Sequence, residues 1–190
     1  MCGRYSLAPE QSADIMRIVR EIEAKFGPGS VSTGEIRPTN AAPVLVAEGS
    51  SDLAPRPVRW GFPGFQGKGV VINARGETAL DKPMFRRSLL ERRCVVPSTG
   101  FYEWDKSKQK YLFRAPDSAV LYLAGLWNTF AGEERFVILT TAPGETVSDI
   151  HDRMPVLLAP HELGDWLHDP GMAAAKLTAR QMDVRRELVS

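Results

Sequence analysis

Apolar residues recur at helical spacing near the start of the chain. In the stretch EQSADIMRIVREIEAKFG, five of them follow one another at intervals of three or four: Ile15, Ile18, Val19, Ile22 and Phe26. This period places them on one face of an α-helix, and Gly27 stands where such a helix is commonly capped. The pattern predicts an amphipathic helix over this stretch.

The pattern changes to short apolar runs beyond the helix. Runs of β-branched and aromatic residues are separated by Gly, Pro, Asn and Asp: PVLVA, VRWGF, VVINAR, CVVP, GFYEW, KYLFR, VLYLAGLW, RFVILTT and PVLLA. MFRRSLLERR and PHELGDWLH read as helices, and the tail around LTARQMDVRREL is a weaker amphipathic segment. Because strands outnumber helices without alternating with them, we predict an α+β fold with a mostly antiparallel, barrel-like sheet flanked by helices.

Length and composition fit one domain. The chain has 190 residues, of which 43% are hydrophobic and 25% charged, so we expect a single domain over residues 1–190. The longest apolar runs are too short to span a bilayer, and no basic segment followed by an apolar stretch marks the N-terminus for secretion. We therefore expect a cytosolic protein without a membrane partner.

The number of cysteines and the spacing of the histidines do not indicate a metal site. Cys2 and Cys94 cannot form a disulfide framework and are expected to be free thiols. His161 and His168 are seven residues apart, which is not the spacing of the H-E-x-x-H zinc motif. No metal or other cofactor is predicted.

The charged residues are unevenly distributed although the net charge is only +1. Residues 56–114 contain 13 Lys and Arg against 5 Asp and Glu, whereas residues 115–170 contain 2 against 9. The first segment could form a basic face for nucleic acid, or the two segments could pair with each other across the fold. The sequence leaves both readings open.

Cys2 stands directly after the initiator methionine, at a position where chains are usually frayed. Removal of Met1 would expose a 1,2-aminothiol, whose α-amine has a pKa of about 7.7–8.0 and is partly unprotonated at neutral pH. The amine can condense with an aldehyde to a Schiff base, and the adjacent thiol can close on it to give a thiazolidine. The alternative is a terminal cysteine with no role.

Asn73 and Arg75 end the run VVINAR and share one side of a strand if the strand continues. The Asn side chain could orient the terminal amine or a substrate, and Arg75 could hold a phosphate. The alternative is a turn with a solvated arginine.

Glu103 and His151 are the candidates for proton transfer. Glu103 stands between Tyr102 and Trp104, where burial would raise its pKa, although strict alternation could turn it toward water instead. His151 precedes an apolar run and carries the side chain best suited to moving protons at neutral pH, although a loop histidine is commonly just surface.

Seven motifs occur together in order: MCGRY, NAAP, RWGF, INARGET, MFR, RRCVVPSTGFYEW and IHDRMP. This set resembles the SOS-response-associated peptidase (SRAP) family, whose members process abasic sites in single-stranded DNA. The motifs run from residue 2 to about residue 160 and leave residues 161–190 outside. The resemblance implies an open, barrel-like core with a positively charged channel, and a monomer that binds single-stranded DNA containing abasic sites.

The resemblance also implies roles for individual residues. Cys2 would form a thiazolidine with the ring-opened abasic aldehyde, with Asn73 orienting the amine, Glu103 moving its proton and His151 opening the sugar ring. A Schiff base that is not trapped can undergo β-elimination, so weak strand-cleaving lyase activity is implied. The implied DNA contacts are Arg4, Phe65, Arg75, Arg86, Trp104 and Arg153. Phe65 stands where the family often has an exposed tryptophan, and Thr99 where an acidic residue or Asn is common.

Three other functions remain open at this point. Glutamine amidotransferases also begin Met-Cys-Gly, so an N-terminal-nucleophile amide hydrolase is one alternative. A peptidase that uses Cys2, Glu103 and His151, acting on substrates that include its own Met1, is a second. A non-catalytic reader of single-stranded DNA is the third.

Overall fold

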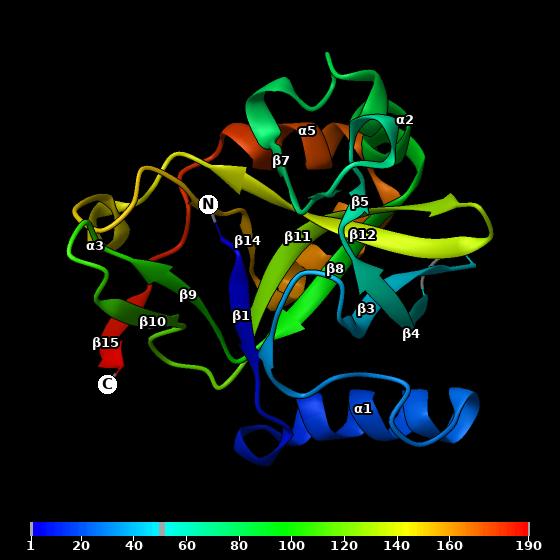
Figure 1. Ribbon diagram of the computed structural model, residues 1–190, viewed down its shortest axis with the longest axis horizontal. Helices are drawn as coiled ribbons and strands as arrows, with labels where there is room; N and C mark the ends of the chain where they lie inside the picture. The colour runs from blue at the N-terminus through cyan, green and yellow to red at the C-terminus, as the bar shows by residue number, and fades with distance from the viewer. Residues whose placement is uncertain (1, 50–51, 190) are drawn as a thin grey trace.

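The computed structural model describes residues 2–49 and 52–189 (Figure 1). The strands are β1 (Arg4–Leu7), β2 (Gly34–Ile36), β3 (Ala41–Glu48), β4 (Asp52–Trp60), β5 (Phe62–Pro63), β6 (Val70–Val71), β7 (Asn73–Arg75), β8 (Arg93–Ser98), β9 (Gly100–Trp104), β10 (Lys110–Arg114), β11 (Leu121–Phe130), β12 (Glu133–Thr141), β13 (Met154–Pro155), β14 (Leu157–Leu158) and β15 (Arg185–Val189). The helices are α1 (Ala13–Phe26), α2 (Pro83–Glu91), α3 (Glu145–Ser148), α4 (Leu163–His168) and α5 (Pro170–Thr178), with short 3₁₀ turns η1 (Pro9–Gln11), η2 (Phe65–Gly67), η3 (Gly76–Thr78) and η4 (Pro160–Glu162).

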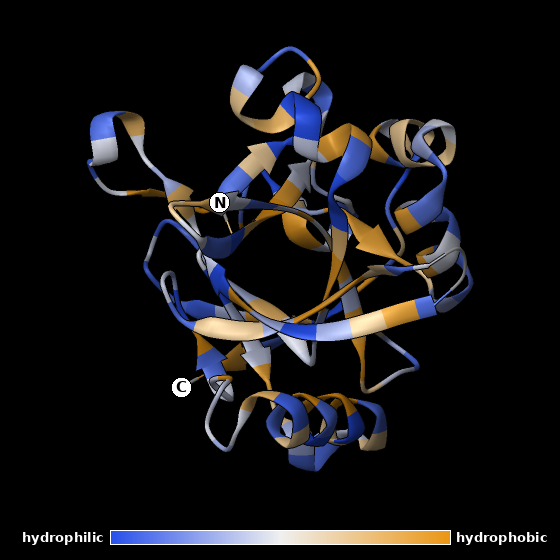
Figure 2. Cartoon of the chain, turned by 90° about the vertical axis from the view of Figure 1, so that its right-hand side faces the viewer, coloured by the Kyte–Doolittle hydropathy of each residue, from blue (hydrophilic) through white to orange (hydrophobic). Residues whose placement is uncertain are grey.

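Five strands form a closed ring. β4 pairs with β3, β3 with β8, β8 with β11 and β11 with β12, all antiparallel. The ring closes where β12 pairs in parallel with β4, at Arg135 opposite Arg59 and Phe136 opposite Trp60. Figure 2 looks onto this ring of strands with α1 below it. The structure confirms the α+β fold with a mostly antiparallel, barrel-like sheet, but the barrel is closed rather than open.

A second sheet carries the start of the chain. Its strand order is β15-β10-β9-β1-β2, and every pairing in it is antiparallel. Arg4 of β1 lies opposite Tyr102 of β9, the residue that precedes Glu103. This register brings the N-terminus of the chain next to Glu103.

Aromatic side chains join the two sheets. Trp60 is fully buried in the barrel and stacks on Phe136, with ring centroids 6.1 Å apart and an interplanar angle of 10°. Tyr5, on β1 of the second sheet, packs on the same Trp60 at 5.3 Å. Burial of a large apolar side chain contributes about 1.5–3 kcal/mol, so this cluster holds β1 firmly against the barrel.

The predicted amphipathic helix is α1. Ser12 caps it by accepting a hydrogen bond from the Ile15 backbone N–H at 3.4 Å, and Gly27 ends it with a φ of 100°. Four of the five predicted apolar positions are buried, namely Ile15, Ile18, Val19 and Ile22. Phe26 is 47% exposed, because it occupies the last helical position. Figure 1 shows α1 lying along one side of the molecule, with α2 and α5 on the opposite side.

The tail of the chain differs from the expectation. Residues 177–188 do not form one amphipathic segment, since Leu177 and Thr178 end helix α5 and residues 185–189 form strand β15. β15 pairs along its whole length with β10 at the edge of the second sheet. Backbone pairing at an edge does not require an alternating apolar pattern, and four of the five residues of β15 are exposed.

The two charged segments pair in part. Arg56 forms an ion pair with Glu134 at 3.4 Å, and Arg59 pairs with Glu133. These contacts cross the parallel β4–β12 junction of the barrel. Other basic residues of the same segment, among them Arg75 and Arg86, are exposed. Within residues 2–49 and 52–189, no helix is long and apolar enough to cross a membrane.

Candidate functional site at the N-terminus

Cys2 is fully buried just before β1. Its Sγ donates to the carbonyl oxygen of Arg4 at 3.6 Å. Burial raises the pKa of the Cys2 thiol above its ordinary value, and the nearby Glu103 carboxylate raises it further. At neutral pH the thiol is therefore protonated in this resting arrangement.

Asn73 contacts Cys2 directly. It lies at the first position of β7, which runs parallel to β12 with Asn73 opposite Ile138. Its Nδ2 donates to the carbonyl oxygen of Cys2 at 3.0 Å. Among the described residues, the buried Oδ1 atom of Asn73 has no hydrogen-bond partner. The side chain thus fixes the terminal residue and keeps an acceptor for a donor on the terminus or on a substrate.

Glu103 is 3% exposed. The alternative that strand alternation turns this side chain toward water is therefore wrong. It lies on β9 between β1 and β10, opposite Tyr111, while its neighbours Tyr102 and Trp104 are half-buried on the other face. Burial raises the pKa of the Glu103 carboxyl, and the positive charge that His151 can carry opposes the shift. A carboxyl group with a raised pKa is suited to exchanging protons near neutral pH.

His151 approaches Glu103 from the loop after α3. Its Nε2 lies 3.9 Å from Oε2 of Glu103, and its side chain is 24% exposed. Two groups lie 3.0 Å from its Nδ1: the backbone N–H of Arg153, which donates to it, and Oδ1 of the exposed Asp152. Only an unprotonated Nδ1 can accept from Arg153, and the backbone donor is fixed whereas the Asp152 side chain is solvated. The neutral ring therefore carries its proton on Nε2, facing Glu103.

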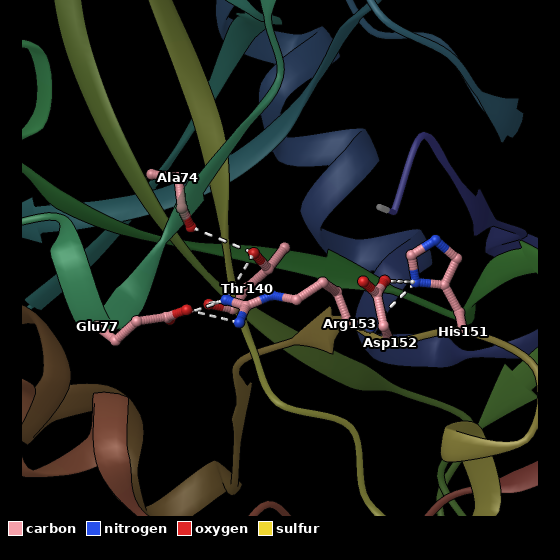
Figure 3. Close-up of polar contacts among 6 residues, drawn as sticks. All are labelled: Ala74, Glu77, Thr140, His151, Asp152 and Arg153. Atoms are coloured by element: carbon pink, nitrogen blue, oxygen red, sulfur yellow. Dashed lines mark hydrogen bonds and ion pairs between the residues drawn. The ribbon is translucent and has the colours of Figure 1, made fainter.

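The side chain of Arg153 points away from this ring, toward Glu77 (Figure 3). Its two Nη atoms donate to the Glu77 carboxylate at 2.6 and 2.8 Å, and Nη2 also donates to the carbonyl oxygen of Thr140 at 2.7 Å. The Arg153 side chain is 13% exposed. The phosphate contact that the resemblance implies for Arg153 stays a prediction, but this guanidinium is already bound within the protein.

Arg4 and Trp104 lie together on the second sheet. The Arg4 guanidinium carbon lies 5.2 Å from the centre of the Trp104 ring, and Nη1 pairs with Glu35 at 2.9 Å. Because Arg4 and Trp104 belong to β1 and β9, they flank the segment that carries Cys2 and Glu103. The two predicted DNA contacts therefore meet each other on the strands that carry the site, but Trp104 is on the face of β9 opposite to Glu103.

The other predicted contacts are on separate elements. Arg75 is exposed at the end of β7, close to Asn73 in sequence. Phe65 is 82% exposed in η2, and Arg86 is exposed on α2. Their roles toward DNA stay predictions.

Sequence reasoning missed a charged cluster beside Trp104. Glu35 pairs with Arg37 at 2.9 Å and with Lys110, in addition to Arg4. The Lys110 Nζ lies 4.1 Å from the centre of the Tyr102 ring. Burial would raise the pKa of Glu35, but hydrogen bonds from Lys110 and Arg37 outweigh it and lower the pKa. Nothing local in the sequence joins Glu35 to Lys110, since only the β2-β1-β9-β10 order brings them together.

The sequence matches the family described as SOS response associated peptidase (SRAP) over residues 1–188. It is 34% identical over 183 residues to abasic site processing protein YoaM of Bacillus subtilis, covering 88% of this chain and 79% of that protein. It is 29% identical over 192 residues to abasic site processing protein YedK of Escherichia coli, covering 94% and 86%.

A solved structure of a protein from Bacteroides thetaiotaomicron has a TM-score of 0.81 at 22% identity, covering 100% of this chain and 92% of that one. A second, from Bordetella bronchiseptica, has a TM-score of 0.78 at 23% identity and covers 100% of both chains. These likenesses show the fold. The family match extends past the motifs that end near residue 160 and includes nearly all of the tail. The chain belongs to the SOS response associated peptidase (SRAP) family.

Proposed function

We propose that this protein processes abasic sites in single-stranded DNA by forming a covalent crosslink through Cys2. The observation that carries the proposal is the meeting of four side chains from distant segments around the start of the chain. Asn73 binds the Cys2 carbonyl at 3.0 Å, and the pair of His151 and Glu103 lies alongside. The relatives named abasic site processing proteins support the part of the proposal that concerns abasic sites.

The first step uses the α-amine of Cys2. It requires removal of Met1, which lies outside the described residues. The free amine attacks the aldehyde carbon of the ring-opened abasic sugar, and the resulting carbinolamine loses one water to give an imine. Glu103 accepts the proton that the amine releases and returns it to the departing hydroxyl, a role that suits a buried carboxyl with a raised pKa.

The second step uses the thiol. The sulfur bonds to the imine carbon while the S–H proton passes to the nitrogen, which closes a five-membered thiazolidine ring. The net reaction joins protein and aldehyde with loss of one water and needs no oxidant or reductant. A thiol kept protonated by burial supplies both the sulfur and the proton. An imine that the thiol does not reach can instead undergo β-elimination, which gives weak lyase activity.

His151 and Asn73 prepare the reactants. In its imidazolium form, with Nδ1–H toward the Asp152 carboxylate, His151 can give its Nε2 proton to the ring oxygen of the closed sugar and release the aldehyde. Asn73 holds the Cys2 carbonyl and so fixes the direction of the amine next to it. The proposed DNA contacts from arginines and Trp104 tolerate any base sequence, because they act on the backbone and on ring faces.

Two variants at the N-terminus test the proposal. Cys2→Ala keeps the amine and should still give a Schiff base that borohydride traps, but no adduct that survives heating without reductant. A residue fused ahead of Cys2 converts the amine to an amide, so it should give neither product although the thiol is retained. Both are mixed with one abasic single-stranded oligonucleotide and followed by gel and intact mass spectrometry.

The wild-type protein gives the reference result. Its mass should lack Met1 and should increase on mixing by the mass of the oligonucleotide less one water. An ordinary thiol nucleophile predicts the reverse ranking, with the fused protein active and Cys2→Ala inactive. A heat-stable adduct from the fused protein would exclude the thiazolidine mechanism.

A further inference from the structure

Asn73 and His151 reach the Cys2 terminus from segments that are far apart in the chain. Each segment carries, a few residues further on, one member of the same ion pair: Glu77 follows Asn73, and Arg153 follows His151. The motifs INARGET and IHDRMP therefore contain both the acting side chains and the residues that connect them.

The connection is specific in its geometry. The two oxygens of Glu77 accept from separate Nη atoms of Arg153 at 2.6 and 2.8 Å, which is a bidentate pair. Nη2 of Arg153 also donates to the carbonyl oxygen of Thr140 at 2.7 Å and lies 3.3 Å from its hydroxyl. That hydroxyl donates to the carbonyl oxygen of Ala74 at 3.5 Å. Figure 3 shows this chain of contacts from Ala74 through Thr140 to Arg153.

Thr140 makes the connection rigid. It lies on β12, a strand of the closed barrel, and pairs in parallel with Arg75 of β7. Arg153 thereby ties the loop of His151 to the barrel and to the turn after Asn73 at the same point. We call the three residues Glu77, Thr140 and Arg153 the clamp.

The Arg153 side chain is enclosed within the clamp. It is 13% exposed, and its Nε is buried without a hydrogen-bond partner in the described part of the chain. The hydrogen bond from Arg153 lowers the pKa of the Glu77 carboxyl, so the pair is ionised on both sides at neutral pH. The backbone N–H of Arg153 donates to Nδ1 of His151, which keeps the proton of the neutral ring on Nε2.

We propose that Glu77 and Arg153 are positioning residues, whose ion pair sets Asn73 and His151 at the correct places around the Cys2 terminus. This inference rests on the proposed function, since the positions matter only for the reaction at Cys2. It differs from the phosphate contact that the resemblance implies for Arg153. The two roles predict opposite effects when the charge of Glu77 is removed.

The experiment compares Glu77→Gln, Arg153→Gln and Arg153→Lys. Single-turnover rates of adduct formation are measured at saturating abasic DNA, and affinity is measured separately with undamaged single strands. We expect both glutamine variants to react about 10- to 100-fold more slowly, because small displacements of acting groups are costly, while affinity changes less than about twofold. Arg153→Lys should recover part of the rate because it keeps the charge but not the bidentate geometry.

Three further measurements separate positioning from general stability. The double variant should be no slower than the slower single variant, because both changes break one pair. The pH–rate profile should shift in the glutamine variants, because the pKa of Glu103 depends on how His151 lies beside it. Glu162→Gln breaks a comparable ion pair with Lys176, 2.7 Å long and 16% exposed at the lysine, and should leave the rate and the profile unchanged.

The inference is overturned if Glu77→Gln reacts at the wild-type rate, and most clearly if it also binds undamaged single strands more tightly. That result would mean that Glu77 merely restrains a phosphate-binding Arg153. Equal slowing by Glu162→Gln would overturn it as well. A wild-type protein that forms no adduct would instead overturn the proposed function itself.

Discussion

His151 and Glu103 face each other across the start of the chain, with Nε2 of His151 3.9 Å from Oε2 of Glu103. The distance is too long for a hydrogen bond but short enough for strong electrostatic coupling. The histidine can be reached from solvent, whereas the glutamate is 3% exposed. In the proposed reaction the pair supplies one proton donor on the substrate side and one acceptor beside the amine, and the charge on His151 lowers the pKa of Glu103.

Replacement of His151 tests this division of roles. We expect His151→Ala to slow adduct formation by about 10²- to 10⁴-fold, the usual contribution of a general acid or base, with little loss of affinity for DNA. Single-turnover kinetics at saturating abasic DNA, with binding to undamaged strands as the control, measure the two effects separately. A parallel loss of rate and affinity would assign His151 to binding instead.

Glu103→Gln should stabilise the protein at neutral pH. Burial raises the pKa of Glu103, so the folded state holds this proton more tightly than the unfolded state, whose pKa is about 4.3. The stability from that proton is fully present below about pH 4 and is lost as the pH rises through the folded pKa. The variant should melt above the wild type at pH 7, and the gap should close by about pH 4.

Glu77→Gln is the matched control for this pH dependence. Its hydrogen bond with Arg153 lowers the pKa of Glu77, so its stabilisation is present above the unfolded pKa and is lost as the pH falls through the folded pKa. The Glu77 variant should therefore melt below the wild type at pH 7 and approach it in acid. Thermal melts of the three proteins between pH 3 and pH 8 should show gaps of opposite sign, and gaps of the same sign would contradict the assigned shifts.

The sequence predicted those elements whose pattern reflects burial. Helix α1 was visible because Ile15, Ile18, Val19 and Ile22 face the core at helical spacing. Strand β15 could not be predicted from its pattern, because its residues are held by backbone pairing with β10 and need no apolar face. The closure of the barrel could not be predicted either, because β4 and β12 are far apart in the sequence and no local pattern connects them.

The sequence predicted which residues belong to the candidate site but not how they contact one another. Burial of Glu103 depends on β9 lying between two strands, which the alternation of its own strand could not reveal. The Glu77–Arg153 pair and the cluster at Glu35 depend on contacts between distant segments. The sequence motifs contain the proposed catalytic side chains, whereas the residues that support them are seen only in the fold.

Gly100→Ala should test how tightly the start of β9 packs against β10. Gly100 has a φ of 148°, and a Cβ there would lie 2.6 Å from the backbone oxygen of Phe113 and 2.8 Å from Leu112 Cδ1. Strain and overpacking should together lower the free energy of unfolding by about 2–4 kcal/mol. Gly132→Ala, with a φ of 84° and open space around it, should cost only about 1 kcal/mol. Urea denaturation measures both, and equal costs would show that the contact at Gly100 relaxes.

Glu35→Gln should strengthen binding to undamaged single-stranded DNA. Glu35 forms ion pairs with Arg4, Arg37 and Lys110, and two of these cations, Arg4 and Lys110, lie over the Trp104 ring. Removing the charge of Glu35 leaves these cations to the phosphates. Affinity at low salt should rise, and the dependence on salt should steepen by roughly 0.7 in log–log slope for each additional phosphate contact. Arg4→Ala should change both quantities in the opposite direction.

Glu134→Gln is the control for net charge, because it removes an equal charge from an ion pair with Arg56 on the barrel. It should raise affinity much less than Glu35→Gln if the effect is local. Fluorescence anisotropy with one labelled oligonucleotide over a series of salt concentrations compares all four proteins. If Glu35→Gln weakens binding, then Glu35 holds Arg4 and Lys110 in their binding positions rather than competing with DNA for them, since the loss of a competing anion cannot lower affinity for a polyanion.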